Sequence, residues 1–269
     1  MMDRRSFVQS TFLETMGGAS MLSAMASPAA AQGSGAAKNP RLYRLSFFYM
    51  RQGDQGSRMS QFLSSQMPLF KKTIPGPIGV FTVFLGPHIP TMVVLAGYPS
   101  FAEMESAPDQ WQKDPGFLKA QQEFERGQEP PFDRADVVLL QATDYSPEIE
   151  PLKEKPKTPR IFELRVYHSP TQWQLRALHE RFSGPEVKIF HRVGVHPILY
   201  SSTLIGPNMP NLTYLTPFAT LADREKAWEA FGADPEWAKV RKESIDRSGQ
   251  IANQISITLL RPTDYSPIQ

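Results

Sequence analysis

The sequence contains no cysteine, which excludes disulfide bonds, thiol nucleophiles, thiolate zinc sites and iron–sulfur clusters in one step. Neither sign of charge is in large excess, because the net charge is +2. The longest lysine-rich block is the segment KEKPK. Nucleic acid is therefore not expected as a partner. No apolar run reaches the roughly 18 uninterrupted residues of a membrane span, so we expect no transmembrane anchor.

Several motifs that carry chemistry are missing as well. Without a G-x-G-x-x-G or Walker pattern, nucleotide cofactors are not expected, and without a G-x-S-x-G elbow serine hydrolase chemistry lacks its signature. The spacings H-x-x-x-H and H-E-x-x-H do not occur, so no metal site is predicted. A haem needs only one suitably placed histidine and stays open as a cofactor. For each histidine the alternative is a surface or helix-capping side chain: His88, His168, His179, His191 and His196.

The N-terminal segment has the features of an export signal. Arg4 and Arg5 precede Ser6-Phe7, a weakly apolar middle follows, and SPAAAQ supplies small residues for cleavage near Ala31. This pattern resembles a twin-arginine signal peptide over residues 1–31, followed by a flexible lead-in over 32–40. It predicts a bacterial protein that is periplasmic or secreted. The alternative is a disordered tail.

A repeat organises the rest of the chain. TDYSP occurs at 143–147 and again at 263–267, 120 residues apart, and LGPHIPTMVVL repeats as IGPNMPNLTYL at the same distance. Only the first strand slips by one residue, which an insertion or deletion in the following loop would explain. The repeat predicts two units, residues 41–147 and 160–269, joined by a proline-rich and charged linker at 148–159.

Each unit has the same order of predicted elements. A strand with period-two alternation is followed by a helix that Gly184-Pro185 bends in the second unit, then by a hairpin, a helix and a last strand. The order β, α, β, β, α, β is the ferredoxin-like arrangement of the α+β class, which leaves one face of each sheet uncovered. We therefore predict that the two sheets pack face to face and form a dimeric α+β barrel within one chain.

Each unit has one Asp-Pro pair within its second helical segment. The pair is predicted to begin a new helix there, because Asp can cap a helix and Pro is favoured at its first position. An aromatic residue follows each pair and is predicted to pack in the core. These residues are Asp114, Pro115 and Phe117 in the first unit and Asp234, Pro235 and Trp237 in the second.

The strand FELRVY, the helix end KIFHRVG, the Gly-Pro turn and above all ADPEWAK resemble the NIPSNAP family of the dimeric α+β barrel superfamily. The resemblance covers both units and is better in the second. It implies the barrel fold but no settled activity, since related barrels include monooxygenases, haem-degrading enzymes and isomerases.

Polar residues of the first strands are the candidate ligand-binding groups. Glu163, Arg165 and Tyr167 alternate with aliphatic residues and are predicted to face the inside of the barrel, where the guanidinium could take a carboxylate or an enolate. The alternative is an ion pair that only fastens one sheet to the other. The full predicted set is Glu163, Arg165, Tyr167, Arg44, Ser46 and His168.

The sequence predicts an exported, non-catalytic binding or interaction module for a small hydrophobic molecule or a protein partner. The alternative is a monooxygenase or isomerase that acts on a hydrophobic ligand inside the barrel. A ligand-sized cavity with the polar residues around it would favour the enzyme, whereas a filled barrel would favour the binding module. Oligomers beyond the internal pseudo-dimer stay open.

Overall fold

A computed structural model describes residues 41–150 and 152–269. The predicted signal peptide and lead-in, and Pro151 of the linker, lie outside the described residues. In the first unit the elements are β1 (Leu42–Tyr49), α2 (Gln55–Thr73), β2 (Ile78–Leu85), β3 (Thr91–Tyr98), α3 (Phe101–Trp111), α4 (Pro115–Glu125) and β4 (Arg134–Ala142). None of the helices in the described ranges is both long and apolar enough to span a membrane.

The second unit repeats this order. Its elements are β5 (Ile161–His168), α5 (Gln172–Arg181), the π-helix η1 (Phe182–Glu186), α6 (Val187–Arg192), β6 (Leu199–Ile205), β7 (Asn211–Phe218), α7 (Leu221–Ala233), α8 (Pro235–Ser248) and β8 (Gln254–Pro262). The predicted βαββαβ arrangement is confirmed in both units.

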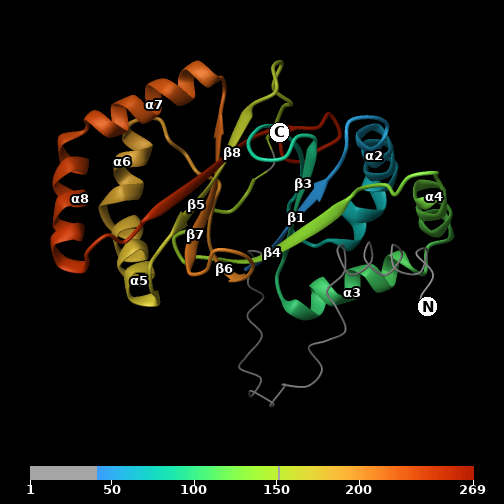
Figure 1. Cartoon of the computed structure of the whole chain (residues 1–269), viewed down its shortest axis with the longest axis horizontal. Coiled ribbons are helices and arrows are strands. Elements are labelled where there is room, and N and C mark those ends of the chain that lie inside the picture. Colours follow the sequence, from blue (N-terminus) through green and yellow to red (C-terminus); the bar gives the residue numbers. More distant parts are fainter. Residues whose placement is uncertain (1–40, 151) are drawn as a thin grey trace, which may run out of the picture.

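The strands close into one barrel in the order β1-β3-β2-β8-β5-β7-β6-β4. Two antiparallel pairs, β2 with β8 and β4 with β6, join one unit to the other. The helices lie outside the strands, α2 to α4 beside the first sheet and α5 to α8 beside the second (Figure 1). The predicted α+β barrel within a single chain is confirmed.

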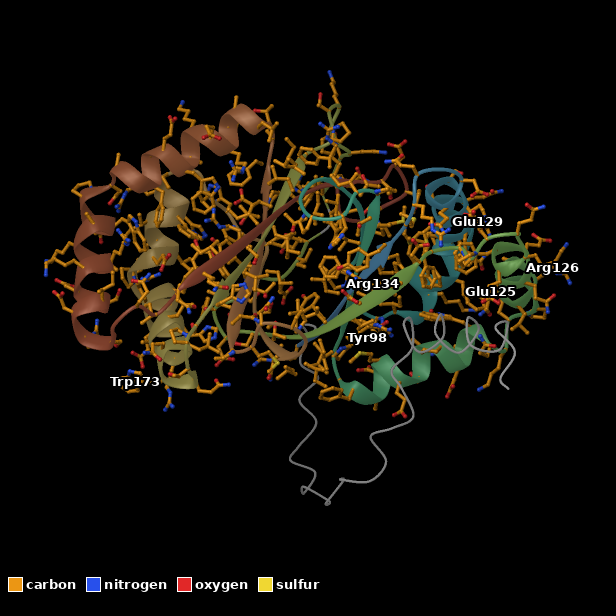
Figure 2. The ribbon with its side chains drawn as sticks, in the orientation of Figure 1. Tyr98, Glu125, Arg126, Glu129, Arg134 and Trp173 are labelled. Atoms are coloured by element: carbon orange, nitrogen blue, oxygen red, sulfur yellow. The ribbon has the colours of Figure 1, made fainter. Side chains whose placement is uncertain are left out.

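The inside of the barrel is a packed apolar core. Inward-facing aliphatic and aromatic residues of both units meet there, and the space left among them is about 10 Å³. A drug-sized ligand needs a cavity of about 300 Å³ or more, so the barrel does not hold one. Separate apolar cores lie between each sheet and its own helices, and Figure 2 shows side chains on both faces of the strands.

The repeated TDYSP segments link the two units reciprocally. After β4, the hydroxyl of Ser146 accepts a hydrogen bond from the backbone N–H of Tyr200 on β6 at 3.0 Å. After β8, the hydroxyl of Ser266 accepts one from the N–H of Val80 on β2 at 2.9 Å. Each unit thus ends in a turn whose serine satisfies a backbone donor of the other unit, which accounts for the serine in both copies of the segment.

The slip of one residue between the two first strands has its cause in the helix and not in the loop. Leu178 in the second unit lies where Met59 lies in the first, 119 residues away, and both are fully buried. Beyond the π-helix η1, Phe190 matches Phe70 at a distance of 120 residues, and both are again buried. The extra residue is accommodated by η1, at the predicted bend, as single π-turns within α-helices allow.

Candidate functional site

The predicted orientation of the first strand of the second unit is wrong. Phe162 and Leu164 face the inside of the barrel, whereas Tyr167 belongs to the core between the sheet and its helices. Because side chains alternate along a strand, Glu163 and Arg165 share the helix side with Tyr167. Their contacts with α7 agree with this placement.

Glu163 is the centre of a polar network, in which Nε of Arg165 is buried without a hydrogen-bond partner among the described residues. Its carboxylate accepts hydrogen bonds from Arg165 at 2.9 Å, from Arg224 at 2.5 Å and from the indole N–H of Trp228 at 3.0 Å. The guanidinium of Arg165 also lies over the ring of Trp228, 4.1 Å from its centroid. With the charges paired in this way, the cluster attaches helix α7 to the sheet.

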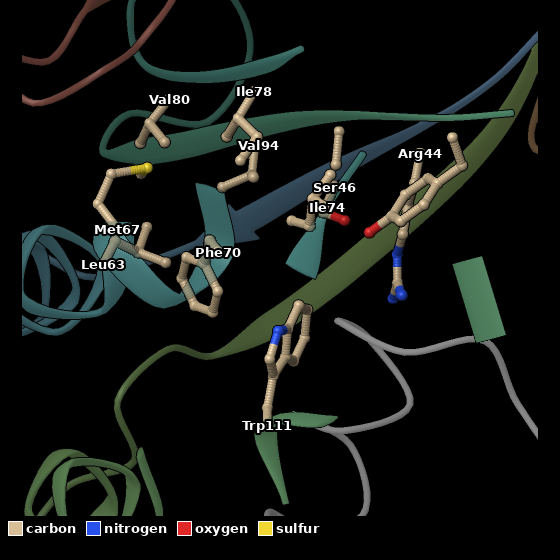
Figure 3. A pocket seen from close by; sticks show the side chains of 12 residues that line it. Arg44, Ser46, Leu63, Met67, Phe70, Ile74, Ile78, Val80, Val94 and Trp111 are labelled. Atoms are coloured by element: carbon tan, nitrogen blue, oxygen red, sulfur yellow. The ribbon is translucent and has the colours of Figure 1, made fainter. Parts of the chain in front are cut away.

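Arg44 and Ser46 lie at the corresponding places in the first unit and do not meet Glu163 and Arg165. They line a small space between the first sheet and its helices, together with Met67, Phe70 and Trp111 (Figure 3). Its volume is about 10 Å³. Burial lowers the pKa of Arg44 to about 10. The predicted common cavity for both polar sets is therefore wrong, because each set lies in its own helix layer.

His168 ends strand β5 and is buried apart from the other predicted residues. One ring nitrogen lies 3.0 Å from the hydroxyl of Ser256 and the other 3.2 Å from the carbonyl oxygen of Asn208. The structure thus gives both nitrogens a partner at the barrel rim. Within the described ranges, no three histidine or carboxylate side chains are close enough to hold a metal ion.

The Asp-Pro residues behave as predicted at the helix starts. Asp114 accepts a hydrogen bond from the N–H of Phe117 at 2.8 Å, and Pro115 is the first residue of α4. Phe117 is buried among aromatic rings of α2 and α3.

In the second unit, Asp234 accepts from the N–H groups of Glu236 and Trp237, and Pro235 begins α8. The ring of Trp237 packs against that of Phe231 at a tilt, with 4.4 Å between the centroids, and lies 4.9 Å from the guanidinium of Arg181. Trp237 therefore packs among the helices. It also contacts the guanidinium of Arg181, whereas the contacts of its counterpart Phe117 are with aromatic rings.

A cleft of about 620 Å³ lies where β4 and β6 join the two units beside α5. Residues of the first unit form one wall, and residues of α5, η1 and β6 form the other. The lining residues are Arg41, Gln141, Ala142, Thr143, Asp144, Tyr145, Arg176, His179, Glu180, Ser183 and Ser202. The cleft is therefore completed only when both units are in place.

His179 links two of these side chains, those of Tyr145 and Ser202. Its Nδ1 lies 2.8 Å from the Tyr145 hydroxyl, and its Nε2 lies 2.8 Å from the Ser202 hydroxyl. Burial lowers the pKa of His179, so the imidazole is neutral near pH 7. Burial raises the pKa of Tyr145, so the phenol keeps its proton. A neutral imidazole between two hydroxyl groups can take up or release a proton at Ser202.

The first unit lacks this arrangement. Ser60 stands where the second unit has His179, and Thr82 stands where it has Ser202. Tyr265 is the counterpart of Tyr145, and its hydroxyl lies beside Ser60 and Thr263. The histidine is thus peculiar to one of two otherwise equivalent places, which indicates that the second unit carries the site.

The sequence reasoning missed Tyr145, His179 and Ser202 as a group. They come from three elements, and the histidine alone is equally consistent with a surface or capping role. A signal was nevertheless available: the repeated tyrosine of TDYSP faces a histidine in one unit and a serine in the other. A comparison of the two units position by position would have found it.

The architecture and the cleft define the class: an α+β barrel of the dimeric type, closed by two units of one chain. The NIPSNAP family model matches residues 162–267, which lie in the second unit. The resemblance stated from ADPEWAK is thereby confirmed for that unit. A comparison with curated proteins finds no match for the chain.

Two solved structures are similar to this chain over most of its length, and a third is similar to a part of it. An anthrone oxidase-like protein is 14% identical with a TM-score of 0.50, over 84% of this chain and 92% of that one. A proposed monooxygenase from Fusobacterium nucleatum is 10% identical with a TM-score of 0.51, over 84% and 93%. A NIPSNAP-like domain protein from Burkholderia xenovorans is 25% identical with a TM-score of 0.35, over 40% and 89%.

Proposed function

We propose that the protein is an exported binding module whose barrel is a rigid support and whose ligand, a small polar molecule, occupies the cleft between the units. One observation carries the proposal. The barrel interior leaves about 10 Å³, whereas the cleft offers about 620 Å³ and is lined by hydroxyl, imidazole and guanidinium groups. A pocket of this size with a few placed polar groups suits a small ligand. Export rests on the Arg4-Arg5 segment alone.

Ligand recognition in this cleft would use groups that neighbouring residues already hold in position. Tyr145 and Ser202 fix the ring of His179 from opposite sides. Arg41 is paired with Asp144 at 2.8 Å, whereas Arg176 on α5 makes no ion pair with any described residue. A preorganised set of donors with one unpaired cation favours a hydroxylated or weakly acidic molecule.

The test uses protein purified from its own exported fraction and examined by native mass spectrometry and absorption spectroscopy. We expect a small molecule bound to the wild type and lost from H179S, which introduces the serine found at that place in the first unit. H196S is the matched control, because His196 is exposed and lies outside the cleft. Equal retention by H179S would contradict the proposal, as would a wild-type protein that carries no molecule and gains no thermal stability from a panel of polar metabolites.

The second candidate is an enzyme that uses His179 as a general base in the same cleft. The observation that favours it is the neutral imidazole held between Tyr145 and Ser202, which is suited to proton transfer. The oxidase and monooxygenase names of the similar structures belong to this candidate through the fold only. Conversion of the co-purified molecule by the wild type, with Y145F slower but equally tight in binding, would favour the enzyme over the binding module.

A further inference from the structure

The second unit contains a buried polar cluster that the first unit does not have, where α5 and η1 meet α8. Arg181 donates from Nε to the carboxylate of Glu186 at 2.6 Å and from Nη1 to the hydroxyl of Ser244 at 3.2 Å. Its guanidinium also lies 4.9 Å from the ring centroid of Trp237. The side chains of Arg181 and Glu186 are 8% and 1% exposed.

The corresponding place in the first unit is entirely apolar. Phe62 and Phe124 stand where the second unit has Arg181 and Ser244, and their rings stack at 4.6 Å. Met67 is the buried side chain of the same part of the helix in the first unit, where the second unit buries Glu186. Three apolar residues in one unit are thus matched by three polar residues in the other. A packed core needs no such exchange, because burying charge is costly unless it has a use or a partner.

A pocket of about 190 Å³ opens beside this cluster, between α5, η1 and α8. Arg181 and Ser244 form its buried part, and Glu180, Glu243 and Arg247 lie at its exposed rim. No described residue accepts a hydrogen bond from Nη2 of Arg181. One oxygen of Glu186, Oε1, is buried without a hydrogen-bond partner among the described residues. The cluster therefore has both a free donor and the space for a ligand.

We propose that this pocket is a binding site for a small monocarboxylate, held by the guanidinium of Arg181, which Ser244 positions by accepting a hydrogen bond from Nη1. A guanidinium offers parallel N–H donors that fit the two oxygens of a carboxylate. The two carboxylates at the rim oppose a doubly charged anion such as phosphate, so a single negative charge fits better. Trp237, from the family motif ADPEWAK, positions Arg181 from the side.

Binding of an anion here is coupled to a proton on Glu186. Burial raises the pKa of Glu186 to about 7 although Arg181 opposes the shift. A second carboxylate beside Arg181 favours the protonated form of Glu186 further, so the ligand binds more tightly at low pH. The charged and titratable groups that face Glu186 or line this pocket from the neighbouring elements are Tyr145, Arg165, Tyr167, Glu180, Tyr200, Tyr214, Glu243 and Arg247.

The experiment titrates the full-length protein with propionate and follows the Arg181 Nε–H signal by NMR. We expect saturable binding that is up to about tenfold tighter at pH 6 than at pH 8, and none of propionamide at the same concentrations. E186Q should bind propionate equally at both pH values, as tightly as the wild type does at pH 6. R241M is the matched control, since Arg241 is an exposed arginine of α8 outside the pocket.

A loss of propionate binding is informative only in a variant that still folds. The triple variant R181F/E186M/S244F introduces the residues of the first unit, so it should keep the circular dichroism of the wild type and lose the response to propionate. Binding of inorganic phosphate in preference to propionate would overturn the proposal. So would unchanged propionate binding in the triple variant, or weaker binding by E186Q at pH 8 than by the wild type.

Discussion

At the scale of single residues, the two units differ most where polar side chains are buried. Glu186 is an acid inside a core that contains three tyrosines of the sheet, Tyr167, Tyr200 and Tyr214. Burial also raises the pKa of Tyr200 and Tyr214, so these phenols stay protonated. One ionisation in this layer, that of Glu186, therefore falls near neutral pH.

This ionisation predicts how the stability of the protein depends on pH. The pKa of Glu186 rises from its ordinary value of 4.5 to about 7 on folding. Because the folded value is the higher one, its contribution to stability is fully present below pH 4.5 and is lost as the pH rises through 7. With about 1.4 kcal/mol per pKa unit, the loss amounts to roughly 3 kcal/mol.

E186Q removes the ionisation and should therefore gain stability relative to the wild type as the pH rises. We expect the two proteins to have similar free energies of unfolding near pH 4.5, and E186Q to be the more stable by roughly 2 to 3 kcal/mol at pH 8. Urea denaturation at a series of pH values measures this. E180Q, a change at an exposed neighbour, is the control, and parallel curves for E186Q and wild type would refute the assignment.

At the scale of elements, the N-cap residue of helix α8 also positions Trp237, because Asp234 accepts a hydrogen bond from the backbone N–H of Trp237. Asp234 accepts two backbone hydrogen bonds and also pairs with Arg192 at 2.7 Å. Its counterpart Asp114 accepts one hydrogen bond, from Phe117. Asp234 therefore makes more polar contacts than Asp114 does.

D234A should lower the free energy of unfolding by about 1 to 2 kcal/mol, since capping residues contribute amounts of this size. D114A is its matched control and should cost less, about 1 kcal/mol. Chemical denaturation followed by circular dichroism compares the two variants. An equal or larger loss in D114A would show that the ion pair and the second hydrogen bond of Asp234 contribute nothing.

The strands show what the sequence could predict and what it could not. Alternation along residues 161–168 correctly grouped Glu163, Arg165 and Tyr167 on one face. It could not say which layer covers that face, because both faces of β5 are buried, one in the barrel and one under helices. The partners that settle the matter, Arg224 and Trp228, come from α7 about 60 residues later, and no local pattern links them to β5.

At the scale of the whole molecule, each sheet needs the other to bury its inner face. The repeat and the element order were sufficient to predict this, because a ferredoxin-like unit leaves one face of its sheet uncovered. Whether the barrel is hollow was not predictable, since it depends on how side chains from eight strands fill the centre. The cleft was also beyond reach, because it is made by residues that only the closed barrel brings together.

A fragment with residues 160–269 alone would expose the inward-facing residues of the second sheet, among them Phe162, Leu164 and Leu260. We therefore expect the fragment to pair with itself and restore a barrel from two identical halves. Light scattering after size-exclusion chromatography measures the mass. A folded fragment that stays monomeric would argue against mutual covering of the sheets.

The reciprocal turns of TDYSP have a consequence for how the chain could evolve. The TDYSP segment of each unit binds a strand of the other unit. A substitution of its serine would therefore weaken the hairpin of the opposite unit. Apart from Tyr145 and Tyr265, the described residues of the apolar cores under the outer helices do not belong to these turns. After duplication, the first unit could therefore keep an apolar core under its helices while the second gained ionisable residues there. The difference between the units lies in these cores and not in the turns that join them.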